Sequence, residues 1–151
     1  MACRSSFLTL AAVSALLLSA CARQEEVRVP VECKAGRAAV RAALARAPKP
    51  VTVEGRPLSS CFTTTSNSAD IAEVGEEHLA VASALADKAR AQPGGPEATR
   101  LGYLIGAVRR GASTTQGTND EMVRRLEQEV LLVDTSSPAF RRGERAGRTG
   151  G

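Results

Sequence analysis

The cysteines and the histidine are the side chains of this sequence that could act as nucleophiles, bind a metal or form a cross-link. There are four cysteines, Cys3, Cys21, Cys33 and Cys61, and a single histidine, His78. A thiolate catalyst needs a positioned base, and a structural zinc site needs four ligands. As argued below, we expect Cys3 and Cys21 to belong to an export signal and a lipid site. The two remaining cysteines and one histidine are too few for either arrangement, so we expect no enzyme activity, no metal and no cofactor.

A second group of polar side chains could form a small binding patch. His78 lies near Glu77 on a predicted helix, where it could bind a ligand or relay a proton. Tyr103 is followed by the basic pair Arg109 and Arg110 at the end of the next predicted helix. The alternative, which we favour, is that the histidine and the tyrosine are packed and hydrogen-bonded, and that the arginines complement the helix dipole.

Composition narrows the class of protein. The chain has 151 residues, of which 43% are hydrophobic, 24% are charged and 3% are aromatic, with no tryptophan. This apolar content is enough for one small domain and excludes a disordered polyelectrolyte. One tyrosine and three phenylalanines cannot form a platform for stacked bases or sugars. We therefore expect no nucleic-acid partner.

The N-terminal residues have the pattern of an export signal. Residues 7–18 (FLTLAAVSALLL) form an unbroken run of apolar and small residues, preceded by one charge at Arg4. The run is too short to span a bilayer as a helix, which needs about 20 residues. It ends in the sequence Leu18-Ser19-Ala20-Cys21, which resembles the lipobox of bacterial lipoproteins.

This resemblance implies a lipid anchor. In bacterial lipoproteins the signal is removed, and a diacylglyceryl group is attached to the sulfur of the cysteine that matches Cys21. Residues 1–20 would then be a signal peptide and residues 21–30 a tether. The lipid would hold the protein at the extracytoplasmic face of the cell membrane, because two or more acyl chains anchor stably. The alternative is an ordinary secretory signal cut after Ala22.

Cys33 and Cys61 are the two cysteines left in the mature chain, and we expect them to form a disulfide. Exported proteins meet an oxidising environment, where an even pair of cysteines is a disulfide candidate. A bridge that closes a loop of about 30 residues stabilises a domain by about 3–4 kcal/mol in the chain-entropy model. The alternatives are a free thiol nucleophile and part of a metal site.

Apolar periodicity predicts a mainly α fold for residues 31–134, a small bundle of about four helices with one short extended or hairpin segment. Ser68 or Asp70 can cap the second helix, and Thr118 can cap the fourth as part of a capping box with Glu121. The predicted helices span residues 31–47, 69–91, 96 or 97–110 and 118–133, and the predicted hairpin lies in residues 51–62.

The third predicted helix is apolar nearly all round, which is typical of a central helix. Gly102 and Gly106 lie one turn apart on it and form a small-xxx-small pair. Such a pair allows another backbone to approach closely.

The C-terminal residues 135–151 carry most of the net charge. They hold four arginines and one glutamate, a net charge of +3, out of +4 for the whole chain. The segment is rich in glycine and arginine and poor in apolar residues, so we expect a disordered tail. Its arginines could be attracted weakly to anionic lipid headgroups or wall polymers. A solvated tail without that role is the interpretation we favour.

Two hypotheses for the function follow. The first is a lipid-anchored cell-envelope protein that acts as a non-enzymatic binding or structural accessory module, with an envelope protein as its partner. The second is a small-ligand binding lipoprotein with a pocket between the helices near Tyr103 and His78. Residues 101–128 are similar to sequences in uncharacterised bacterial exported proteins, a resemblance that implies no activity.

Overall fold

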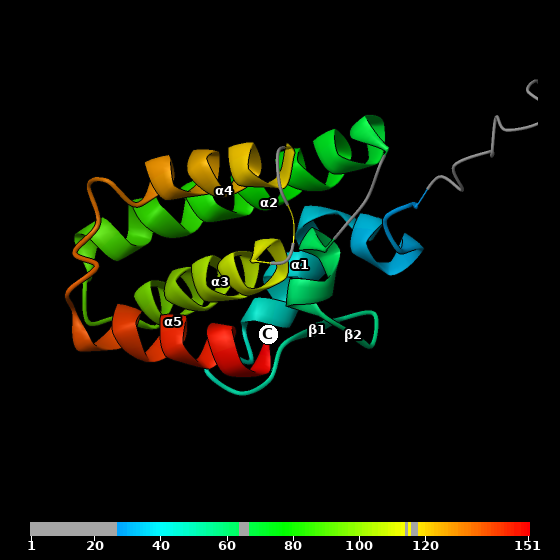
Figure 1. Cartoon of the computed structure of the whole chain (residues 1–151). Helices are drawn as coiled ribbons and strands as arrows, with labels where there is room; N and C mark the ends of the chain where they lie inside the picture. Colours follow the sequence, from blue (N-terminus) through cyan, green and yellow to red (C-terminus); the bar gives the residue numbers. More distant parts are fainter. Residues whose placement is uncertain (1–26, 64–66, 114, 116–117) are drawn as a thin grey trace, which may run out of the picture.

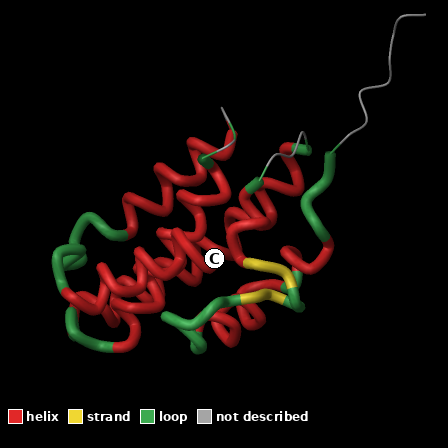
Figure 2. Tube along the Cα trace, turned by 60° about the horizontal axis from the view of Figure 1, so that its bottom comes forward, coloured by secondary structure: helices red, strands yellow, loops and turns green. Residues whose placement is uncertain are grey.

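The structure is a computed structural model, and it describes residues 27–63, 67–113, 115 and 118–151. This part of the chain is mainly helical, as predicted, with two short strands together at one end of the helical body (Figure 2). In chain order its elements are η1 (Val31–Lys34), α1 (Gly36–Leu44), β1 (Thr52–Val53), β2 (Arg56–Pro57), η2 (Leu58–Phe62), α2 (Ser68–Ala91), α3 (Pro96–Ala112), α4 (Thr118–Glu129) and α5 (Pro138–Gly150).

The larger helices are arranged as two pairs (Figure 1). α4 lies alongside α2 in one pair, and α5 lies alongside α3 in the other. α3 also contacts α2, α4 and η2, and Leu101, Tyr103 and Leu104 on it are fully buried. The prediction that the third helix is central is therefore confirmed.

The contact between α3 and α5 is built from glycines on both helices. A Cβ atom added at Gly102 would lie 2.2 Å from the carbonyl oxygen of Phe140, and one added at Gly147 would lie 2.1 Å from that of Tyr103. Gly106 and Gly143 meet the opposite backbone equally closely. The small-xxx-small pair thus has the role expected of it, and α5 supplies a matching pair.

The expectation of a disordered tail in residues 135–151 is wrong, because residues 138–150 form α5. Ser137 caps the helix, since its hydroxyl accepts a hydrogen bond from the amide of Phe140 at 3.3 Å, and Pro138 occupies the first turn. The face that packs on α3 contains Ala139, Phe140 and two glycines. Burial of this face supplies the stability that the local sequence does not.

The first predicted helix is divided into two parts. Gly36 has a φ of +81°, which separates η1 from α1 and which favours glycine over other residues. α1 then ends at Leu44, three residues before the expected end. The chain continues to the hairpin, in which Thr52 pairs with Pro57 and Val53 with Arg56.

A disulfide joins the two 3-10 helices. The sulfur atoms of Cys33 in η1 and Cys61 in η2 are 2.02 Å apart, and both residues are buried. The expected pairing is therefore present. The bridge attaches the N-terminal end of the domain to η2, which packs on α3.

The proposed tether, residues 21–30, is shorter than expected at its C-terminal end. Val29 is buried, and its amide donates a hydrogen bond to Oδ2 of Asp70 at 3.3 Å. Nζ of Lys34 lies 2.5 Å from Oδ1 of the same carboxylate. These two bonds hold the chain against the first turn of α2, so the domain already begins at Val29.

Two helix ends differ from the prediction. The N-cap of α2 is Asn67, whose Oδ1 accepts a hydrogen bond from the amide of Asp70 at 2.9 Å, and not Ser68 or Asp70. α4 ends at Glu129 and is followed by tight turns, although Val133 beyond it is still buried. The capping role predicted for the Thr118 side chain lies outside the described residues.

Candidate functional site

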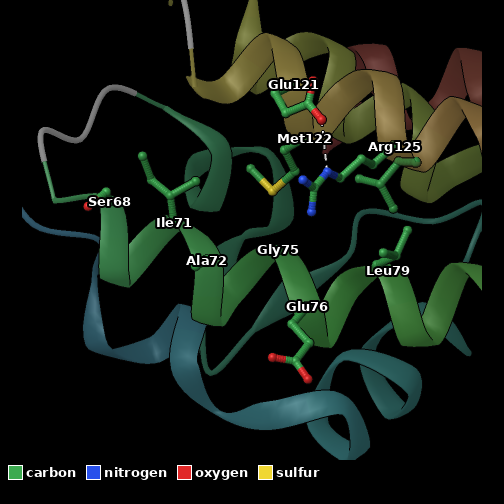
Figure 3. Close-up of a pocket in the computed structure, with 10 residues that line it drawn as sticks. Ser68, Ile71, Ala72, Gly75, Glu76, Leu79, Glu121, Met122 and Arg125 are labelled. Atoms are coloured by element: carbon green, nitrogen blue, oxygen red, sulfur yellow. Dashed lines mark hydrogen bonds and ion pairs between the residues drawn. The ribbon is translucent and has the colours of Figure 1, made fainter.

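An apolar groove lies between the first half of α2 and α4 (Figure 3). Its volume is about 420 Å³. The side chains of Ile71 and Leu79 on α2 point towards α4, while Glu76 points away from it (Figure 3). The residues that line the groove are Ser68, Ile71, Ala72, Gly75, Glu76, Leu79, Glu121, Met122, Arg125 and Leu126.

Small residues on α2 open this groove. A Cβ atom added at Gly75 would lie 3.1 Å from Sδ of Met122, so the methionine side chain rests directly on the glycine. Ala72 is exposed, and its short side chain does not fill the space above this part of α2. Met122 and Leu126 are buried on the α2 side of α4, whereas Leu79 is only half-buried. The two helices therefore meet at the glycine and leave apolar surface uncovered on either side of it.

Two charged residues of α4, Glu121 and Arg125, line the groove, and Arg124 lies next to them outside it. Glu121 lies 2.9 Å from Nε of Arg125 and also pairs with Arg124. Hydrogen bonds first from Arg124 and then from Arg125 lower the pKa of the Glu121 carboxyl, so it is ionised at neutral pH. Both arginine side chains are about two-thirds exposed, at 68% and 64%. One carboxylate thus faces two accessible guanidinium groups.

The lining of the groove suits binding better than catalysis. Its floor is aliphatic, and the charged groups on its α4 side, Glu121 and Arg125, form an exposed ion pair. Among the residues that the structure describes, no group of three or more histidine, cysteine, aspartate or glutamate side chains could hold a metal ion. The groove can accept apolar side chains or an apolar ligand, with Arg125 available to an acidic group on the occupant.

Tyr103 is a core residue and not part of a binding patch. It is completely buried, and its hydroxyl accepts a hydrogen bond from the amide of Val51 at 2.9 Å. Burial raises the pKa of the Tyr103 phenol. Its hydroxyl thus fixes the chain that leads into β1.

His78 is also in the core. It is completely buried, its Nδ1 lies 2.7 Å from the carbonyl oxygen of Val74, and its ring meets that of Phe62 edge-on at 4.8 Å. Burial lowers the pKa of the imidazole, so it is neutral at pH 7. Neither His78 nor Tyr103 lines the groove, and both are completely buried.

Arg109 and Arg110 on α3 form non-covalent contacts with α4 and α5. The Arg109 guanidinium pairs with Glu127 of α4 at 2.7 Å and with Glu144 of α5. Arg110 donates to the carbonyl oxygen of Thr149 in the last turn of α5. The structure therefore separates the four predicted binding candidates into two core residues and two inter-helix contacts, and brings none of them to the groove.

Sequence reasoning missed the groove, although it placed several of its residues correctly. Its apolar lining residues recur at helical spacing in the sequence, Ile71 and Leu79 within one predicted helix and Met122 and Leu126 within another. What could not be seen is that the two faces do not cover each other completely. The one signal in the sequence for a groove between the two helices is that two small residues, Ala72 and Gly75, lie about one turn apart on α2.

The structure adds little on membrane attachment, and comparison with other proteins adds nothing. None of the helices in the described part of the chain is long and apolar enough to cross a membrane. The expected lipid site, Cys21, lies outside the described residues. Comparisons of the chain with known protein families, with curated proteins and with solved structures find no match.

Proposed function

We propose that this chain is a lipid-anchored cell-envelope protein that acts as a non-enzymatic binding module. The anchor is Cys21, at the end of the lipobox-like sequence, and it holds the protein at the extracytoplasmic face of the membrane. The disulfide between Cys33 and Cys61 supports an exported protein, because such bridges persist in oxidising compartments. The observation that carries the binding role is the open, apolar groove between α2 and α4.

The occupant that suits this groove best is an amphipathic helix of an envelope protein. The apolar floor between Ile71 and Leu79 extends over about two helical turns, or roughly 12 Å. A helix that lies in such a groove inserts side chains spaced three and four residues apart. The accessible guanidinium of Arg125 at the edge of the groove favours a partner with an acidic residue beside its apolar face.

Site-specific cross-linking in intact cells would identify the partner. A photoreactive amino acid replaces the exposed groove residue Ala72, or Ala42 on the exposed surface of α1 as the control. The cross-linked protein is identified by mass spectrometry, and its binding segment is then made and titrated against the purified protein. We expect the Ala72 position, and not Ala42, to capture an amphipathic segment.

Substitutions at the same two positions test whether the groove is the site. Ala72→Glu places a charge on the apolar floor, and we expect it to weaken binding of the segment at least about tenfold. Ala42→Glu makes the same chemical change away from the groove and should leave binding unchanged. Equal binding by both variants would refute the groove as the docking site.

A small apolar ligand is a second candidate, because the groove volume of about 420 Å³ is within the range of ligand sites. An acidic head group on the ligand would pair with Arg125. Native mass spectrometry of the purified protein distinguishes the two candidates. A bound metabolite that is lost in Ala72→Glu, with no protein cross-linked from Ala72, would favour the ligand.

The anchor needs a separate test. Mass spectrometry of the N-terminal peptide of the mature protein should show a diacylglyceryl group on Cys21. A Cys21→Ser variant should leave the membrane fraction. An unmodified cysteine, or a variant that still sediments completely with membranes, would contradict the lipid anchor.

A further inference from the structure

Four arginines are grouped on the exposed side of helix α5. Arg141, Arg142, Arg145 and Arg148 are exposed, and we call these four residues the basic face. They follow one another within two turns, over roughly 10 Å of the helix. The helix thereby holds the four charges in a fixed row.

The glycine contact with α3 determines where this face points. At 100° per residue, the buried residues Ala139, Phe140, Gly143 and Gly147 occupy one side of α5. Arg141 and Arg145 occupy the opposite side, and Arg142 and Arg148 lie at its two edges. Because the backbones of α3 and α5 are in contact, α5 cannot rotate without losing its packing. The centre of the basic face is therefore directed away from the body of the protein, while Arg142 at its edge reaches Thr99 of α3.

The basic face is only partly neutralised by its surroundings. Arg148 lies 3.7 Å from Glu144, whose carboxylate also pairs with Arg109. Arg142 donates to the hydroxyl of Thr99 at 3.2 Å, which is uncharged. Arg145 forms no ion pair with any residue that the structure describes. Residues 21–134 have equal numbers of basic and acidic side chains, so the net charge of the mature chain resides in this helix.

We propose that the basic face of α5 rests on the anionic lipid headgroups of the membrane that carries the protein. This proposal rests on the anchor at Cys21 for its location, while the arrangement of the arginines is independent of the anchor. The face lies on a single helix on the outside of the bundle, and the hollow that Arg141 borders also contains Glu127 and Glu144, whose charges would repel a polyanionic strand. It also lacks a large apolar side chain that would insert below the headgroups. A flat, negatively charged surface matches both properties.

The anchor keeps this contact within reach. Val29 is eight positions after Cys21, and an extended chain of that length spans at most about 28 Å. The radius of gyration of a domain of this size is about 14 Å, so the tether lets the basic face turn to the membrane. Each basic residue near an anionic surface strengthens binding about fivefold. With the net charge of +3 that remains after Glu144 is counted, the gain is about a hundred-fold, enough to orient a protein that the lipid already holds nearby.

Chemical modification of arginines tests the proposal on the full, lipidated protein. The protein is reconstituted into vesicles of phosphatidylcholine alone or with about one-third phosphatidylglycerol, and treated with a dicarbonyl reagent that modifies arginine. Modification is measured residue by residue by mass spectrometry. We expect the basic face to react at least about fivefold more slowly on anionic vesicles, while Arg41, exposed on α1, reacts equally on both. High salt should abolish the difference, because it shortens the Debye length.

A pair of charge-matched variants provides the control. Arg141→Glu/Arg145→Glu and Arg41→Glu/Arg46→Glu change the net charge equally, but only the first alters the basic face. The first should abolish protection of Arg142 and Arg148 on anionic vesicles, and the second should leave it intact. Equal rates on both vesicles, or protection that follows net charge in both variants, would overturn the proposal.

Two further outcomes are separable from these. Protection of the basic face by soluble polyphosphate but not by anionic vesicles would identify a polymer site and overturn the membrane contact. If the peptide that contains Cys21 proves unmodified, the anchor fails by itself. Co-sedimentation of that unlipidated protein with the two kinds of vesicle then tests the basic face directly. Binding to anionic vesicles that is lost in Arg141→Glu/Arg145→Glu supports it, and no binding refutes it.

Discussion

The substitution Gly147→Ala tests whether α5 is packed on α3 by backbone contact. The added Cβ atom would lie 2.1 Å from the carbonyl oxygen of Tyr103 and 2.8 Å from the amide nitrogen of Ala107. Ordinary packing begins at 3.4 Å, so the first contact is about 1.3 Å too short. Both neighbours are main-chain atoms of a buried helix, so α5 itself must move outwards.

The expected loss of stability combines two opposite effects. Overpacking of a well-packed interior costs about 1–3 kcal/mol, and the upper end applies because no side chain can move aside. Replacing glycine by alanine within a helix contributes about 1 kcal/mol in the other direction. The net change is a decrease of about 2 kcal/mol in the free energy of unfolding. For a domain of this size the melting temperature falls by roughly 8 °C.

Urea unfolding followed by circular dichroism measures this change, with Gly150→Ala as the matched control. A Cβ atom at Gly150 would meet only Cγ of Pro50, at 3.8 Å, so this variant gains helix propensity without overlap. We expect Gly147→Ala to lower the midpoint at unchanged slope, and Gly150→Ala to leave it unchanged or raise it slightly. If both variants were equally stabilised, α5 would be a solvated helix and the glycine interface would be refuted.

Two further predictions concern the disulfide and the buried histidine. Reduction of the bridge between Cys33 and Cys61 should lower the free energy of unfolding by about 3–4 kcal/mol, since it closes a long loop; an unchanged thermal melt with two titratable thiols would contradict this. His78 has a lowered pKa in the folded protein, so its contribution to stability is present above the unfolded value of 6.5 and is lost as the pH falls below it. The free energy of unfolding should therefore decrease below pH 6.5 by up to about 1.4 kcal/mol per pH unit. In His78→Phe most of this dependence should be lost between about pH 5.5 and 7, because the chain has no other histidine and the carboxyls with a lowered pKa titrate at lower pH; an unchanged slope would exclude His78 as its source.

The elements that could be predicted from the sequence are those that bury large apolar side chains. α3 carries Leu101, Leu104 and Ile105 close together, and its central position follows from that pattern. The disulfide could be predicted because the proposed signal peptide and lipid site account for the other two cysteines and leave one possible pairing. In both cases the residue types themselves indicate the structure.

Helix α5 could not be predicted because its cause lies elsewhere in the chain. Gly143 and Gly147 favour a break in a helix when they are considered alone. They are compatible with a stable helix only because Gly102 and Gly106, some 40 residues earlier, offer a matching surface on α3. The groove has the same origin, since it depends on how far α4 covers α2 and not on the apolar face of either helix.

The disulfide also determines how the domain responds to a mechanical load. Force applied through the N-terminal segment enters the fold at Val29 and reaches Cys33 within four residues. There the covalent bond carries it directly to Cys61, so α1 and the hairpin lie in a closed ring outside the path of tension. The ring spans 28 residues in sequence, and its chain, about 95 Å when extended, is not released on unfolding. A protein pulled from its N-terminal segment would thus transmit force straight to η2 and the central helix, and in its reduced form α1 and the hairpin would come under load first.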